Sequence, residues 1–123
     1  MSIRGVRGAT TVPADQPELI LEATRELLEA ILKANSGMHP EDIASVFFTV
    51  TSDLVSTFPA QGARQMGWGL VPMICSVEIP VPGSLPHVIR VLVHWNTDCD
   101  QSAVTHVYLH EAVKLRPDLI AAQ

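Results

Sequence analysis

Arginine carries most of the positive charge in this chain, and it is the side chain best suited to binding small anions. Six of the eight basic residues are arginine and only two are lysine. A planar guanidinium binds a carboxylate or phosphate through two parallel hydrogen bonds, which a lysine ammonium does not reproduce. Because the net charge is −5, non-specific binding to nucleic acid is disfavoured. The composition therefore predicts recognition of a small anion, using some of Arg4, Arg7, Arg25, Arg64, Arg90 and Arg116.

Arg90 is the most informative of these arginines because it lies inside an apolar segment. Residues 87–95 are His-Val-Ile-Arg-Val-Leu-Val-His-Trp, a pattern that predicts a strand covered on at least one face. A guanidinium taken out of water without a partner costs on the order of several kcal/mol, so an anion must meet it. Considered alone, this strand favours an ion pair with a carboxylate such as Glu78, or escape of the head group at a sheet edge, over a ligand site.

Other kinds of chemistry lack their sequence signatures. The five histidines and two cysteines do not have the spacings that metal sites need, and no nucleophile motif or glycine-rich phosphate loop is present. We therefore expect neither a metal nor a cofactor. The remaining polar side chains suit a reaction that needs conformational restraint and electrostatic stabilisation without covalent help. They are Arg7, Arg64, Arg90, Arg116, Glu78, Tyr108 and Cys75.

Composition also bears on location and assembly. No apolar run is long enough to span a bilayer, and residues 1–8 do not form a signal peptide, so we expect a cytoplasmic protein with no membrane partner. Cys75 and Cys99 are too few for a disulfide framework. With 47% hydrophobic residues and a mean hydropathy of +0.24, the chain has more apolar surface than a domain of this size buries by itself. Burial between subunits is therefore predicted.

The periodicity of the chain predicts one α+β domain over residues 1–123, with a mixed, mostly antiparallel sheet and one long amphipathic helix packed on it. We expect Glu78 and Arg90 on neighbouring strands. Gly5 and Gly8 leave space around Arg7, which indicates either close approach by a ligand or another backbone, or a glycine bulge with exposed arginines. The predicted strands are 2–12, 44–51, 71–79, 87–96 and 105–109; the predicted helices are 16–35 and a short one over 59–66.

An ordered set of short motifs resembles the monofunctional Bacillus-type chorismate mutases. The match runs from residue 3 to residue 119 with similar spacing throughout, which makes it far more specific than any one motif. Its parts are Ile3-Arg4-Gly5-Val6-Arg7-Gly8-Ala9-Thr10-Thr11-Val12, Phe58-Pro59-Ala60 with Arg64, Val71-Pro72 with Cys75 and Glu78, Ile89-Arg90-Val91, His106-Val107-Tyr108-Leu109, and Leu115-Arg116-Pro117-Asp118-Leu119.

The resemblance implies a homotrimer that converts chorismate to prephenate in active sites between neighbouring subunits. Arg90 would donate to the ether oxygen as its C–O bond breaks, Arg7 and Tyr108 would hold a carboxylate, and Glu78 would accept from the ring hydroxyl with Cys75 beside it. Residues implied to shape or close the pocket are Phe58, Ala60, Met73, Ile74, Arg64, Leu115 and Arg116. Gln61 stands where some relatives have lysine.

One conflict and two rival functions accompany this interpretation. Cys75 and Glu78 fall on opposite faces of a regular strand, so lining one pocket together requires a bend or bulge near Ser76. A trimeric protein that binds a small dicarboxylate without turnover is the first rival. An enzyme of the trimeric imine-deaminase type is the second.

Overall fold

A five-stranded sheet forms the frame of the molecule. The computed structural model describes residues 2–115. Its strands are β1 (Ser2–Thr11), β2 (Ile43–Val50), β3 (Met73–Val77), β4 (Val88–Thr97) and β5 (Val107–Tyr108). Its helices are α1 (Pro17–Ala34) and α2 (Pro59–Gln65), with short 3₁₀ segments η1 (Pro40–Asp42), η2 (Gln101–Ala103) and η3 (His110–Lys114).

The strand order β3-β2-β4-β1-β5 makes the apolar strand β4 the centre of the sheet. β4 pairs antiparallel with both β1 and β2, whereas β3 and β5 join the edges through parallel ladders. The sheet is therefore mixed, as the sequence predicted. The prediction that segments 71–79 and 87–96 form neighbouring strands is wrong, because β2 lies between them. The α2 segment carries the chain from β2 to β3 and so allows these strands to pair in parallel.

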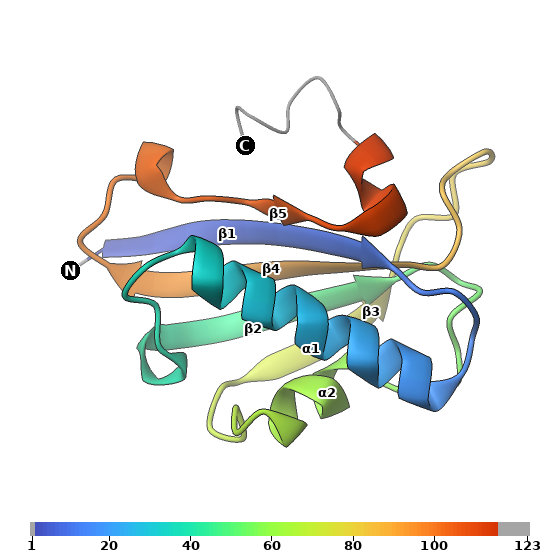
Figure 1. Cartoon of the computed structure of the whole chain (residues 1–123), viewed down its shortest axis with the longest axis horizontal. Helices are drawn as coiled ribbons and strands as arrows, with labels where there is room; N and C mark the ends of the chain where they lie inside the picture. Colours follow the sequence, from blue (N-terminus) through green and yellow to red (C-terminus); the bar gives the residue numbers. More distant parts are fainter. Residues whose placement is uncertain (1, 116–123) are drawn as a thin grey trace.

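One face of the sheet is covered by α1 (Figure 1). The helix buries one side against the strands, through Ile20, Ala23, Thr24, Leu27, Leu28 and Ile31. This packing explains one of the glycines next to Arg7. A Cβ added to Gly8 would come within 2.7 Å of Ile31 Cδ1, so Gly8 makes room for the helix. The close approach predicted from that glycine is therefore to the protein itself.

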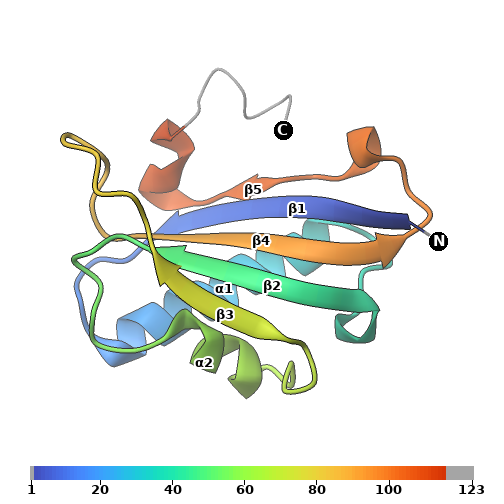
Figure 2. The ribbon, with the colours of Figure 1, turned by 180° about the vertical axis from the view of Figure 1, so that it is seen from behind.

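The opposite face carries no helix over the strands (Figure 2). Alternation along the paired strands places Ile3, Phe47 and Ile74 on this face. Their exposed fractions are 56%, 45% and 60% respectively. Large apolar side chains gathered on one open sheet face are typical of a surface that meets another protein chain. In the described part of one chain, nothing covers them.

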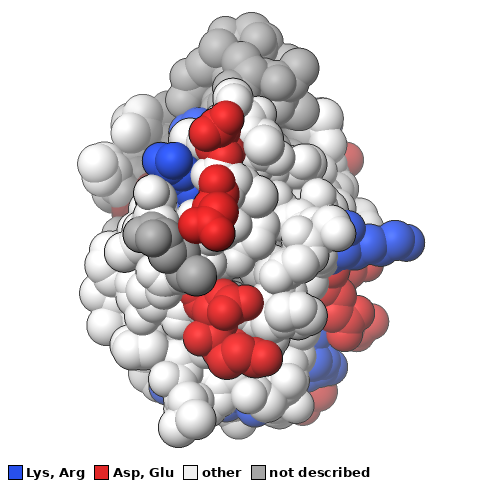
Figure 3. All heavy atoms as spheres, turned by 90° about the vertical axis from the view of Figure 1, so that its left-hand side faces the viewer, with Lys and Arg blue, Asp and Glu red and all other residues white. Residues whose placement is uncertain are grey.

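Acidic side chains gather at one end of the molecule. Figure 3 shows a column of Asp and Glu on the end of the sheet where η1 and the loop after β4 lie. Such a surface repels nucleic acid, in agreement with the net charge of −5. No helix in the described residues is long and apolar enough to cross a membrane.

Candidate active site

Arg90 and Glu78 face each other across an intervening strand. The distance from Arg90 Nε to Glu78 Oε2 is 3.6 Å, a loose ion pair outside direct hydrogen-bond range. Arg90 stands on β4, and Glu78 follows the end of β3. Thr49 of β2 lies between them: it pairs with Arg90 in the sheet, and its hydroxyl donates to Glu78 Oε2 at 2.5 Å. The predicted carboxylate partner is thus present, although its strand is one position farther away than the sequence suggested.

Arg7, Tyr108 and Leu115 join this pair around one cavity of about 280 Å³, which we call the arginine cavity. β5 pairs in parallel with β1 and brings Tyr108 opposite Ala9, two residues from Arg7. The cavity lies on the open face of the sheet, and it is lined by Arg7, Gly8, Ala9, Phe47, Thr49, Glu78, Arg90, Val91, Leu92, Tyr108 and Leu115.

His106 holds the backbone at Arg7. The main-chain N–H of Arg7 donates to His106 Nδ1 at 2.9 Å, which requires that nitrogen to be unprotonated. Burial, helped by the positive charge of Arg7, holds the pKa of His106 below its ordinary value. Both effects favour the neutral imidazole. The bond therefore fixes the position of Arg7 relative to the start of β5.

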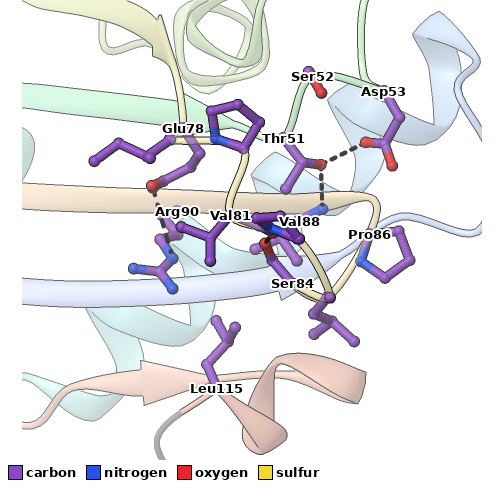
Figure 4. A pocket seen from close by; sticks show the side chains of 15 residues that line it. Thr51, Ser52, Asp53, Glu78, Val81, Ser84, Pro86, Val88, Arg90 and Leu115 are labelled. Carbon is purple, nitrogen blue, oxygen red and sulfur yellow. Dashed lines mark hydrogen bonds and ion pairs between the residues drawn. The ribbon is translucent and has the colours of Figure 1, made fainter.

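A larger cavity of about 620 Å³ adjoins the arginine cavity and shares Glu78, Arg90 and Leu115 with it (Figure 4). Its outer wall is the proline-rich loop 79–86. The loop is fixed where it joins β4, because the main-chain N–H of His87 donates to the Asp53 carboxylate at 3.1 Å. Glu78 and Arg90 therefore stand where two hollows meet, reachable from either side.

The other predicted pocket residues lie around a separate hollow of about 300 Å³, which we call the cysteine cavity. It lies between α2 and the edge strand β3. The N-terminal turn of α2 and its exposed Arg64 form one wall, and β3 forms the other. Its lining residues are Phe58, Ala60, Arg64, Met73, Ile74 and Cys75.

The bend or bulge near Ser76 that one shared pocket would require is not present in β3. β3 pairs with β2 in continuous register from Met73 to Val77. Cys75 pairs with the buried Phe48 and packs toward the α1 side of the sheet, whereas Glu78 contacts Thr49 on the open side. Because the strand is regular, Cys75 and Glu78 lie in different cavities of the chain.

Two further residues singled out in the sequence, Arg116 and Gln61, are not among the described residues that line either cavity. Arg116 lies outside the described residues. Gln61 is exposed on α2, where its side chain accepts from the Thr57 hydroxyl at 3.2 Å. In the part of the chain that the structure covers, no group of three His, Cys, Asp or Glu could hold a metal ion. Two residues in contact with the site, Thr49 and His106, were not predicted to act there, since a single hydroxyl or imidazole in a strand has no sequence signature.

Three comparisons with known proteins agree. The family model for chorismate mutase type I matches residues 3–119. A chorismate mutase of Thermus thermophilus is 60% identical over 98% of this chain and 99% of its own length. One of Bacillus subtilis is 46% identical over 97% of this chain and 94% of its own. A solved chorismate mutase from Clostridium thermocellum superposes with a TM-score of 0.85 at 46% identity, covering 88% of this chain and 96% of the other.

These matches define the chain as an isomerase. It belongs to the chorismate mutase type I family, which confirms the resemblance of its ordered motifs. The activity that follows from this membership is the isomerisation of chorismate to prephenate, a step toward the aromatic amino acids.

Proposed function

We propose that the chain rearranges chorismate to prephenate by a pericyclic reaction in the cytoplasm, without cofactor, at sites between the subunits of a homotrimer. The observation that carries this proposal is the Arg90–Glu78 pair, loosely held at 3.6 Å in a cavity that also contains Arg7 and Tyr108. Chorismate is a dianion with an ether oxygen and a ring hydroxyl. These side chains offer two guanidinium groups for its negative charge and one carboxylate for its hydroxyl.

Arg90 supplies the electrostatic part of catalysis. When C–O cleavage runs ahead of C–C formation, negative charge grows on the ether oxygen, and a cation already in place stabilises the transition state more than the ground state. The position of Arg90 in the central strand β4 supports this role, because pairing on both sides fixes the backbone from which the side chain extends. The side chain itself is 47% exposed in the single chain, so it can reach a ligand in the cavity.

Conformational restraint is the second contribution. The reaction requires the extended dianion to fold into a chair-like conformer that brings the two carbons to be joined into contact. In our proposal, Arg7 and Tyr108 hold one carboxylate and Glu78 accepts from the ring hydroxyl. Cys75 approaches the same hydroxyl, Arg64, Leu115 and Arg116 close or steer the entrance, and the apolar walls are Phe58, Ala60, Met73 and Ile74.

The trimer is supported by two features of the single chain. Residues implied to share one pocket are divided between the arginine cavity, on the open face over β1, β2 and β4, and the cysteine cavity, at the β3 edge of the sheet. A second subunit that brings its cysteine cavity to the arginine cavity of the first would complete the site. The exposed apolar face with Ile3, Phe47 and Ile74 offers the surface for such contact.

Loss of chorismate absorbance, measured with and without a chelator, tests the activity. We expect turnover that the chelator leaves unchanged. Binding of chorismate without turnover would instead indicate a dicarboxylate-binding protein, and hydrolysis of enamines with no action on chorismate would indicate an imine deaminase. Sedimentation equilibrium tests the assembly, with three times the 13.4 kDa mass of one chain expected.

A further inference from the structure

Thr49 occupies the one place in the sheet that separates Arg90 from Glu78. On β2 it pairs with Arg90 of β4 on one side and with Ser76 of β3 on the other. Its hydroxyl donates to Glu78 Oε2 at 2.5 Å, while the same oxygen lies 3.6 Å from Arg90 Nε. The same carboxylate oxygen thus accepts a hydrogen bond from Thr49 while it lies outside direct hydrogen-bond range of Arg90 Nε.

A second bond from the neighbouring residue anchors the backbone of Glu78. Its main-chain N–H donates to the carbonyl of Val50 at 2.8 Å. Two consecutive residues of β2 therefore hold both the backbone and the carboxylate of Glu78, which stands just beyond the last residue of β3. A glutamate at the end of an edge strand would otherwise retain several rotamers.

We propose that Thr49 is a positioning residue for the mutase reaction, whose hydroxyl holds the Glu78 carboxylate away from Arg90. With Oε2 bound to Thr49, Glu78 Oε1 is the oxygen that meets the substrate hydroxyl, and the Arg90 fork stays available for the ether oxygen. Without the hydroxyl, the carboxylate closes onto Arg90 in a direct charge-assisted pair, which neutralises the cation that the transition state needs. The inference rests on the proposed roles of Arg90 and Glu78.

The test compares Thr49→Val, which replaces the hydroxyl by a methyl group of similar size, with Thr49→Ser, which keeps the hydroxyl. We expect T49V to lower kcat by about 10- to 100-fold, the range for losing a hydrogen bond to a charged group, with less than about a threefold change in KM. T49S should restore kcat to within about threefold of the parent. Ser45→Ala is the matched control, because Ser45 lies on β2 with its hydroxyl bonded to His94, away from Glu78.

A double-mutant cycle separates positioning from a general structural effect. In an E78A background, T49V should cost less than about threefold in kcat, since no carboxylate remains to be held. An equal cost with and without Glu78, or parental kcat in T49V, would overturn the proposal. If T49V folds poorly, T49S and Thr49→Ala in the same cycle answer the same question.

Crystal structures of the parent and T49V give a readout that does not depend on turnover. The proposal expects the Glu78 Oε2 to Arg90 Nε distance to contract from 3.6 Å to a direct hydrogen bond. An unchanged distance in T49V would contradict it. Failure of the parent to act on chorismate would refute the proposed function instead, so the two outcomes are distinguishable.

Discussion

The arginine cavity and the cysteine cavity differ in what they hold and in how they are built. The arginine cavity rests on the paired strands β1, β2 and β4 and contains two guanidinium groups and a carboxylate. The cysteine cavity lies at the edge of the sheet, between β3 and the seven-residue helix α2, and Arg64 is the one charged side chain in its lining. One cavity offers preorganised charge and the other offers mainly shape.

In the proposed site, the two cavities would perform different parts of catalysis. Charge must stay in place during the reaction to stabilise a transition state, and both arginines stand on strands that are paired on two sides, β1 and β4. Apolar walls tolerate small displacements, so an edge strand and a short helix suffice. If the two cavities form one site between subunits, variants in each should have distinct kinetic effects and should complement each other.

Arg90→Ala gives the largest effect expected in the arginine cavity. Loss of one neutral oxyanion donor typically costs about 10²–10³ in rate, and a charged donor contributes more. We therefore expect kcat to fall by about 10³ or more, with a much smaller change in KM, as steady-state kinetics with chorismate would measure. Arg90→Lys should also be poor, because a point charge does not reproduce the planar fork.

Arg25→Ala is the matched control for this loss. Arg25 lies on α1, where its guanidinium donates to the Gln65 side chain, and no residue of α1 lines the arginine cavity. Its replacement should leave kcat unchanged. Near-parental kcat in R90A would remove Arg90 from the mechanism and leave the arginine cavity as a binding site only.

Arg64→Glu tests whether the cysteine cavity belongs to the same site. Arg64 is exposed on α2, so the variant should fold, while the new carboxylate repels a dianionic substrate. We expect kcat/KM to fall by about 10², since like charges near a protein surface interact by a few kcal/mol at about 4 Å. Gln65→Glu, on the same helix but outside the cavity lining, should have little effect.

Coexpression of R64E with R90A then asks whether the two cavities come from different subunits. In a random mixed trimer, about a quarter of the interfaces would pair an intact Arg64 with an intact Arg90. Activity should therefore recover to about a quarter of the parent, although each variant alone is nearly inactive. No recovery in the mixed protein would place both residues in one subunit's site.

Glu78→Ala should lower activity less than R90A or R64E does. It removes an acceptor for the ring hydroxyl and also the anion that faces Arg90 at 3.6 Å, so part of the lost binding is offset by a freer cation. We expect kcat/KM to fall by about 10- to 100-fold, and Glu78→Gln, which keeps an acceptor oxygen, to fall less. An unchanged kcat/KM in E78A would take this residue out of the site.

The sequence predicted the bounds of the strands and helices better than the order of the strands in the sheet. The apolar run around Arg90 and the long amphipathic period gave strand and helix within about two residues of β4 and α1. Strand order was the error, because chain proximity favours pairing of consecutive strands. The long loop 79–86 and the crossover through α2 instead insert β2 between β3 and β4. Nothing local in the sequence specifies that insertion.

The contacts within the candidate site were also harder to predict than the residues that make them. Glu78 was predicted as the partner of Arg90 from its charge, and the contact exists, but Thr49 stands between them on β2, a predicted strand that was not expected to separate the two. The opposite directions of Cys75 and Glu78 were predicted from alternation, and β3 has no bulge that would bring the two side chains together within one chain. Charge requirements can be inferred residue by residue. The side chains that satisfy them depend on which strands meet, which is a tertiary property.

His106→Asn gives the smallest effect and concerns how firmly the arginine cavity is built. Burial and the charge of Arg7 lower the pKa of His106 in the folded chain, whereas an unfolded chain keeps the ordinary value of 6.5. The stabilising contribution of neutral His106 is therefore complete above that value. It declines as the pH falls from about 6.5 through the lower folded pKa, because the unfolded state takes up the proton first.

Denaturation at fixed protein concentration between about pH 7 and pH 5 measures this contribution. The amide side chain introduced by H106N can still accept from the Arg7 N–H but does not titrate, so this variant should show a shallower loss of stability on acidification than the parent. Between pH 7 and pH 5, the loss of kcat/KM should also be about a few-fold smaller in H106N than in the parent. The matched control, His39→Asn, removes an exposed histidine at the start of η1 and should keep the parental slope. Parallel slopes for parent and H106N would mean that the Arg7–His106 bond does not stabilise the arginine cavity, and that its charges are held by the strand pairing of β1 with β4 alone.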